Sequence, residues 1–187
     1  MAVAVHPRLF SVDEYYAMGE AGVFAPDERV ELLDGEILSM PPIGSRQTGS
    51  VNRLNAVLAP QFGRRAIVQV QNPVRLSNDS EPEPDIALLR PCGDFYSARH
   101  ALPEDVFALI EVADSSLPYD RGRKLRACAR SGIAEYWIVN IRDRQVEVHR
   151  RPSGDDYAQR IVCGGHGTVA FAAFPEDVLN IDDVLGP

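Results

Sequence analysis

The sequence has few cysteines, almost no lysine and no long apolar run. The three cysteines, at positions 92, 128 and 163, form no CxxC pair, which argues against a zinc knuckle and a disulfide framework and favours a reducing cytoplasm. No apolar stretch approaches the roughly 20 residues that span a bilayer, and the N-terminus lacks the apolar segment of a signal peptide. These absences predict a cytoplasmic protein that does not enter a membrane.

Positive charge is also scarce. With 27 acidic and 19 basic residues, the 187-residue chain carries a formal net charge of -8. The chain as a whole therefore does not attract nucleic acid, and any DNA binding has to be local or assisted by a metal ion. Because 45% of the residues are hydrophobic, the chain can bury one sizeable core, and we expect a single domain over residues 1–187.

Turn signals and hydrophobic spacing predict alternating helices and strands. Ser11 and Glu14 form a capping-box pattern ahead of a short helix, and Asp34-Gly35 is the expected turn of a β-hairpin over residues 29–38. An amphipathic helix is expected through Val51, Leu54, Leu58 and Phe62. Further expected elements are strands at 66–71, 74–76, 86–89, 106–112, 135–140 and 145–150, a helix at 119–130 and short strands after 155.

This order of elements predicts an α/β fold with a mixed sheet, helices on both of its faces and an N-terminal β-hairpin. The run at 106–112, VFALIEV, is apolar at almost every position. Such a pattern is typical of a central strand that is covered on both sides.

Two carboxylates mark the ends of expected core strands. Asp85 follows Pro84 at the start of one strand, and Glu111 is the one ionisable residue of VFALIEV. A carboxylate there is costly to ionise unless it is paired, hydrogen-bonded or bound to a metal, so a divalent cation is a natural partner for both. Alternatively, Asp85 is a turn residue and Glu111 pairs with an arginine. The neighbouring Glu81 and Glu83 are expected to be solvated.

The single lysine, Lys124, stands on the helix that follows the strand of Glu111. A lone lysine among 18 arginines suits a task that needs a compact, titratable charge. However, Asp120 lies four residues earlier, at the spacing of an ordinary ion pair on a helix surface. From these residues alone, both interpretations stand.

Five sequence blocks lie in a fixed order between about residues 10 and 150. They are ELLDGE from Glu31, Pro84-Asp85, IEV ending at Val112, DRxxK from Asp120 to Lys124, and GIAEYWIV from Gly132. Together they resemble the Uma2 family of restriction-endonuclease-like proteins, in the PD-(D/E)XK nuclease superfamily. The resemblance implies a restriction-endonuclease-like mixed β-sheet flanked by helices, with the motifs in a core at about 10–150 and a C-terminal β extension at 151–187.

The resemblance also implies phosphodiester hydrolysis at an acidic site. Asp85 and Glu111 would be the motif acids and, with the Val112 carbonyl, would hold Mg²⁺ or Mn²⁺. The metal would polarise the scissile phosphate and activate a water, which Lys124 would orient or help to deprotonate. Glu31 matches the N-terminal glutamate of the family and would be a second-metal or outer-shell ligand.

Two positions depart from the expected pattern. The motif lysine ordinarily follows the glutamate by two residues, but Ala113 stands there, and the resemblance moves the lysine to position 124. Gln47 stands where family members commonly have a histidine. These departures keep open a second interpretation, in which the nuclease fold has weak or no activity and serves nucleic-acid binding or protein assembly.

Three functions are therefore considered. The first is a metal-dependent DNA endonuclease, for which a homodimer would make cutting of both strands geometrically simple. The second is the catalytically weak or inactive module. The third is a glycosidase that uses Asp85 and Glu111 as its carboxylate pair, which leaves Lys124 without a role.

Overall fold

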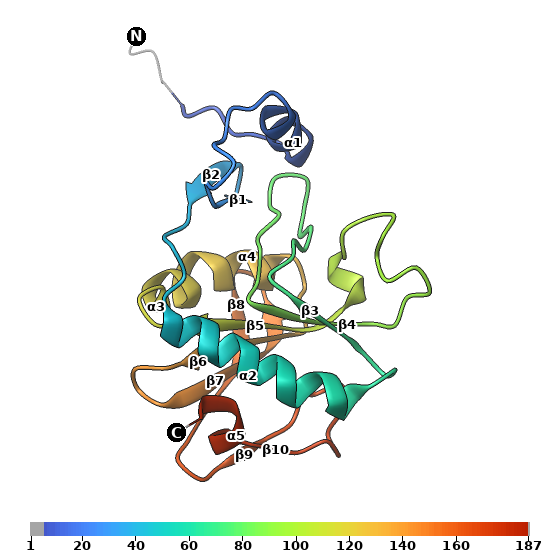
Figure 1. The fold of residues 1–187 in the computed structure, drawn as a ribbon, viewed down its shortest axis with the longest axis vertical. Coiled ribbons are helices and arrows are strands. Elements are labelled where there is room, and N and C mark those ends of the chain that lie inside the picture. The colour runs from blue at the N-terminus through green and yellow to red at the C-terminus, as the bar shows by residue number, and fades with distance from the viewer. Residues whose placement is uncertain (1–5, 187) are drawn as a thin grey trace.

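A six-stranded mixed sheet forms the centre of the computed structural model, which describes residues 6–186 (Figure 1). Neighbouring strands are antiparallel except for the parallel pair β5 and β6. In spatial order the strands are β3 (Ile67–Val70), β4 (Ile86–Leu89), β5 (Val106–Ala113), β6 (Glu135–Asn140), β7 (Gln145–Ser153) and β8 (Asp156–Gly164). The predicted α/β fold with a mixed sheet is confirmed. Two parts of the chain, residues 1–5 and residue 187, lie outside the described residues. Residues 1–5 belong to the N-terminus for which no targeting segment is expected.

Helices cover both faces of this sheet (Figure 1). The helices α2 (Ser45–Phe62) and α5 (Ile181–Leu185) pack on one face. The other face carries α3 (Leu117–Tyr119), a π-helical turn (Asp120–Lys124) and α4 (Leu125–Arg130). Strands β4, β5 and β6 are consequently buried on both sides, as the apolar run at 106–112 predicts. Within residues 6–186, no helix combines the length and apolarity needed to cross a membrane.

The N-terminal segment forms the predicted helix and hairpin. Helix α1 (Val12–Glu20) begins with the capping box of Ser11 and Glu14. Strands β1 (Val30–Leu33) and β2 (Glu36–Ser39) pair through a turn in which Asp34 and Gly35 have φ values of 53° and 74°, as a type I′ turn requires. The Glu81 N–H donates to the Leu32 carbonyl oxygen over 2.8 Å. This contact holds β1 against the segment that leads into β4.

Some expected elements differ from those in the structure. Residues 74–76 are not a strand: Val74 makes one isolated bridge to Ala101, and the buried Val74 and Leu76 contribute to the core from a loop. The helix expected at 119–130 begins at Leu117 and contains the π-helical turn. The expected strands after 155 are confirmed by β8, β9 (Thr168–Val169) and β10 (Leu179–Asn180). Helix α5 was not predicted, because five residues are too few to display helical spacing.

Candidate active site

The start of β4 and the end of β5 meet at one edge of the sheet. Because these strands are antiparallel, with Ile86 opposite Ile110, Asp85 lies beside Glu111. The Asp85 N–H donates to Glu111 Oε2 over 3.4 Å, and the Val112 N–H donates to Asp85 Oδ2 over 2.9 Å. Both carboxylates are buried and line a cavity of about 200 Å³. The two acids that the sequence assigns to strand ends are therefore adjacent.

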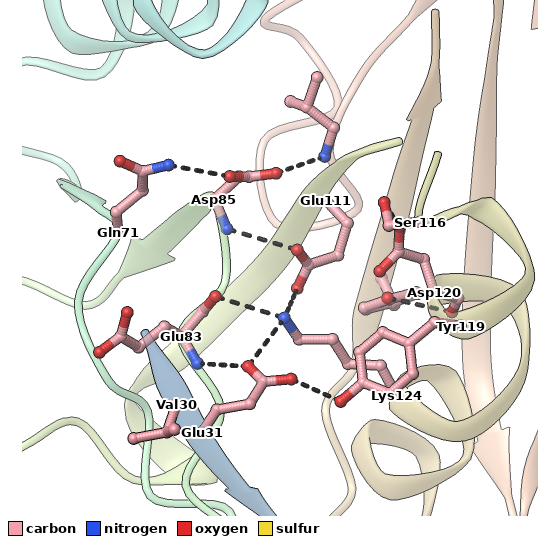
Figure 2. Close-up of polar contacts among 12 residues, drawn as sticks. Val30, Glu31, Gln71, Glu83, Asp85, Glu111, Ser116, Tyr119, Asp120 and Lys124 are labelled. Atoms are coloured by element: carbon pink, nitrogen blue, oxygen red, sulfur yellow. Dashed lines mark hydrogen bonds and ion pairs between the residues drawn. The ribbon is translucent and has the colours of Figure 1, made fainter. Parts of the chain in front are cut away.

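Lys124 is buried among carboxylates and does not lie on the helix surface. Its side chain is 3% exposed, and Nζ lies 3.0 Å from Glu111 Oε1 and 3.4 Å from Glu31 Oε2 (Figure 2). Nζ also donates to the Glu83 carbonyl oxygen over 3.3 Å. The alternative of a surface ion pair with Asp120 is therefore wrong. A π-helical turn, a feature frequent at functional sites, carries both residues at this point.

Glu31 reaches the same cluster from the N-terminal hairpin. It is 2% exposed, although β1 belongs to a separate two-stranded sheet. One carboxylate oxygen, Oε2, accepts the Glu83 N–H over 3.1 Å, and the other accepts the Tyr119 hydroxyl (Figure 2). The hairpin therefore contributes a second buried acid beside Lys124, after Glu111.

Burial and charge set the pKa values of this cluster. Burial raises the pKa of the Glu111 carboxyl well above its usual value, and Lys124 only partly opposes this rise. Burial alone would lower the pKa of the Lys124 ammonium, but the surrounding carboxylates outweigh it and raise that pKa well above its usual value. Lys124 therefore stays charged, and the acids around it favour further positive charge.

Two glutamines bind the carboxylate of Asp85. The Gln47 amide, in the first turn of α2, donates to Oδ2 over 3.2 Å and to Oδ1 over 3.4 Å. The Gln71 amide donates to Oδ1 over 3.2 Å. Gln47 thus lies at the site, where the resemblance had placed a histidine. Gln71 was missed because a single glutamine after a strand carries no sequence signal.

A family model matches residues 12–182 of this chain, and the family is described as "Uma2: Putative restriction endonuclease". The chain belongs to the Uma2 family. A similar solved structure is that of "a putative nuclease belonging to DUF820 from Anabaena variabilis ATCC 29413", with a TM-score of 0.68 and 18% sequence identity over 94% of this chain and 97% of that chain. At that identity the likeness shows the fold alone. A search of curated proteins gives no match.

Asp85 and Glu111 offer carboxylate oxygens at this Uma2 site, the donor type that a hard divalent cation prefers. Glu111 Oε1 is buried without a hydrogen bond from any described group, although the Lys124 ammonium is 3.0 Å away. Within residues 6–186, no three His, Cys, Asp or Glu side chains converge as a complete metal centre, so a bound ion would also need backbone or water oxygens. The cavity wall carries five acids, Glu83, Asp85, Glu111, Asp114 and Asp120, and two basic residues, Arg29 and Lys124.

Asp120 is a further buried acid of the site that the sequence did not assign to it. It is 3% exposed and accepts a hydrogen bond from the Ser116 hydroxyl over 2.5 Å. Burial raises the pKa of its carboxyl to about 6, with Lys124 and the Ser116 hydrogen bond opposing the rise. Because Asp120 lies four residues before Lys124, its spacing suggested a surface ion pair. The sequence therefore did not identify Asp120 as a residue of the site.

Replacing Asp120 by asparagine is expected to change how stability depends on pH in the presence of a chelator. Because the folded-state pKa, about 6, exceeds the ordinary 3.8, the folded protein holds the proton more tightly. The resulting stability is complete below pH 3.8 and is lost as the pH rises through about 6. Over that range, wild type should lose about 3 kcal/mol of unfolding free energy relative to Asp120→Asn.

Urea unfolding at a series of pH values, in EDTA, measures this difference. The matched control is Asp27→Asn, because Asp27 is exposed. Its unfolding free energy should follow that of wild type at every pH. Parallel curves for wild type and Asp120→Asn would contradict the prediction.

The expectation that Glu81 is solvated is wrong. Glu81 is 2% exposed, and the hydroxyl of Tyr16, on α1, donates to its Oε1. Glu83 is half-buried at the cavity wall, and burial raises the pKa of its carboxyl above the usual value. The acidic turn is covered because residues distant in sequence fold against it, and local spacing cannot reveal such a contact.

Proposed function

We propose that this Uma2 protein is a metal-dependent endonuclease that hydrolyses DNA phosphodiester bonds. The observation that carries the proposal is the meeting of Asp85, Glu111 and Lys124 at one cavity, from three separate elements. Family membership supports a nuclease-like function. Two acids at the ends of neighbouring strands, with a buried lysine from the following helix beside one of them, can bind a cation and act on a phosphodiester beside it.

Asp85 and Glu111 would hold Mg²⁺ or Mn²⁺, together with the Val112 carbonyl. The Val112 N–H faces Asp85, and the carbonyl of a strand residue lies on the same strand edge as its N–H. When bound, the ion would polarise the phosphate and lower the pKa of a coordinated water. Oxygen donors of this kind suit both ions.

Lys124 and Glu31 would complete the site beside the two acids that hold the metal. The charged Lys124 ammonium would orient the attacking water and offset negative charge that develops on the phosphate. Glu31 would hold Lys124 in place through their 3.4 Å contact and would act as an outer-shell or second-metal ligand. The glycosidase alternative gives Lys124 no such task.

Cleavage of supercoiled plasmid DNA with Mg²⁺, with Mn²⁺ or with EDTA tests the proposal. Nicked or linear product should form only when the metal is present. Equal cleavage in EDTA would contradict a metal-dependent mechanism. Parallel assays with a single-stranded DNA and an RNA of the same sequence would define the substrate class.

One observation favours the second candidate, a nuclease-fold module without turnover. Amide donors from Gln47 and Gln71 occupy the Asp85 oxygens that a metal would need. Calorimetric titration with Mn²⁺ separates the two candidates. The absence of both a metal site and cleavage would favour the module, whereas metal binding with cleavage would exclude it.

A further inference from the structure

A second cavity, of about 460 Å³, is lined by arginine and lies next to the candidate active site. Arg46 and Arg53 come from α2, and Arg142 and Arg144 come from the turn between β6 and β7. None of the described residues that line it is acidic. In a chain with a net charge of -8, this cavity is a local concentration of positive charge.

Two of these arginines form no ion pair among the described residues, although the Arg53 guanidinium lies against Gly186. Arg46 and Arg53 are seven residues apart, so they lie two turns apart on the same side of α2, while the opposite side carries buried residues such as Phe62. Both arginines are exposed. Among residues 6–186, neither has a carboxylate within ion-pair distance.

The arginine cavity and the acidic cavity share a wall. Arg142 Nε donates to Asp114 Oδ1 over 2.8 Å, and Asp114 lines the acidic cavity. The start of α2 also borders both, because Gly44 and Gln47 line the acidic cavity while Ser45 and Arg46 line the arginine cavity. The two cavities therefore adjoin each other.

We infer that the arginine cavity binds the phosphodiester backbone of the nucleic-acid strand on the side adjoining its scissile phosphate. This inference rests on the proposed function, because that function places the scissile phosphate at the acidic cavity. In a duplex, successive phosphates of one strand are about 3.4 Å apart along the axis, so neighbouring phosphates must lie close to the acidic site. The guanidinium group suits phosphate because it donates two parallel hydrogen bonds.

The first turn of α2 adds to this attraction. It contains no acidic residue, and the N-cap Gly44 provides no side-chain cap, so its first N–H groups remain available to an anion. The positive end of the helix dipole favours a phosphate at the same point. Base-independent contacts of this kind position a strand without reading its sequence.

The test compares Arg46→Ala/Arg53→Ala with wild type in fluorescence anisotropy, using a labelled DNA duplex and EDTA to prevent the proposed hydrolysis. The double variant should bind about tenfold more weakly, or worse, and its log-log salt slope should be smaller by about two, because two phosphate contacts are lost. Alanine favours the helix, so α2 should persist, and circular dichroism checks this.

The matched control is Arg64→Ala/Arg126→Ala, which removes the same charge elsewhere. Arg64 is exposed beyond the far end of α2, and Arg126 is exposed on α4, across the sheet. This variant should keep the affinity of wild type within about twofold, since exposed charges far from a strand are screened. Equal losses in both double variants would overturn the inference, as would a wild type that binds no strand.

Inorganic phosphate at matched ionic strength serves as a competitor. It should displace the duplex only weakly, because a single phosphate ion fills one cavity whereas a strand joins both. Efficient displacement by phosphate would instead assign the cavity to a free phosphate ion. If the arginine variant loses binding but wild type never cleaves with Mg²⁺ or Mn²⁺, binding of the backbone at the arginine cavity stands and the proposed hydrolysis fails. If wild type cleaves and the arginine variant binds normally, the proposed hydrolysis stands and the inference fails.

Discussion

Asp85→Asn is expected to reduce the rate of metal-dependent plasmid cleavage by about 10³-fold, because a loss of about 4 kcal/mol of transition-state stabilisation corresponds to that factor. The substitution keeps the shape of the side chain and removes the charge that would bind the cation. Mn²⁺ affinity, measured by calorimetry, should fall in the same variant. The two losses should occur together because one carboxylate accounts for both.

The matched control for this prediction is Glu104→Gln. Glu104 is exposed in the connection between β4 and β5, and its replacement removes one negative charge away from the cavity. It should leave both cleavage and Mn²⁺ binding unchanged. Full activity in folded Asp85→Asn, verified by circular dichroism, would refute the assignment of the metal site.

The parts of the fold that depend on local signals were predictable from sequence. The Asp34-Gly35 turn fixes the hairpin through two positive φ values, which few other dipeptides adopt easily. The run from Val106 to Val112 identifies a central strand because it leaves no polar face. Helix α5 and the loop at 74–76 escaped prediction, since each is shorter than the window over which periodicity becomes visible.

The candidate site was predictable only in part, for a physical reason. Strand ends gave Asp85 and Glu111, because an ionisable residue beside an apolar run needs a partner. The spacing of Asp120 and Lys124 was ambiguous, and burial of both residues resolved it. Glu31 was assigned to the site only through the family resemblance. No local sequence pattern indicates that the hairpin will fold against the segment before β4.

Contacts between distant segments account for what the sequence concealed. Glu81 is buried because α1 brings Tyr16 to it across 65 positions of sequence. The arginine cavity draws on α2 and the turn after β6, which are about 90 residues apart and carry no shared motif. Such features arise from topology, so they become visible only once the strands are ordered in space.

Lys124→Met is expected to separate the structural and catalytic roles of the buried lysine. In EDTA it should lower the unfolding free energy by about 3 to 5 kcal/mol, because Glu31 and Glu111 lose the charge that compensates them. Mn²⁺ should restore part of this stability, since an ion that binds only the folded state stabilises it by mass action. Cleavage should nevertheless fall by about 10²-fold or more at a temperature where the variant is folded.

Metal affinity distinguishes this result from the loss expected in Asp85→Asn. Lys124 competes with a cation for Glu111, so Lys124→Met should bind Mn²⁺ at least as tightly as wild type. Lys124→Met/Glu111→Gln should regain stability in EDTA, because it removes one of the uncompensated acids, and it should bind Mn²⁺ weakly. Normal turnover in Lys124→Met would restrict Lys124 to a structural role. Loss of Mn²⁺ binding in Lys124→Met would mean that the lysine is needed to assemble the carboxylates into a metal site. In that case the proposal that the acids bind the metal while the Lys124 ammonium acts in catalysis would fail.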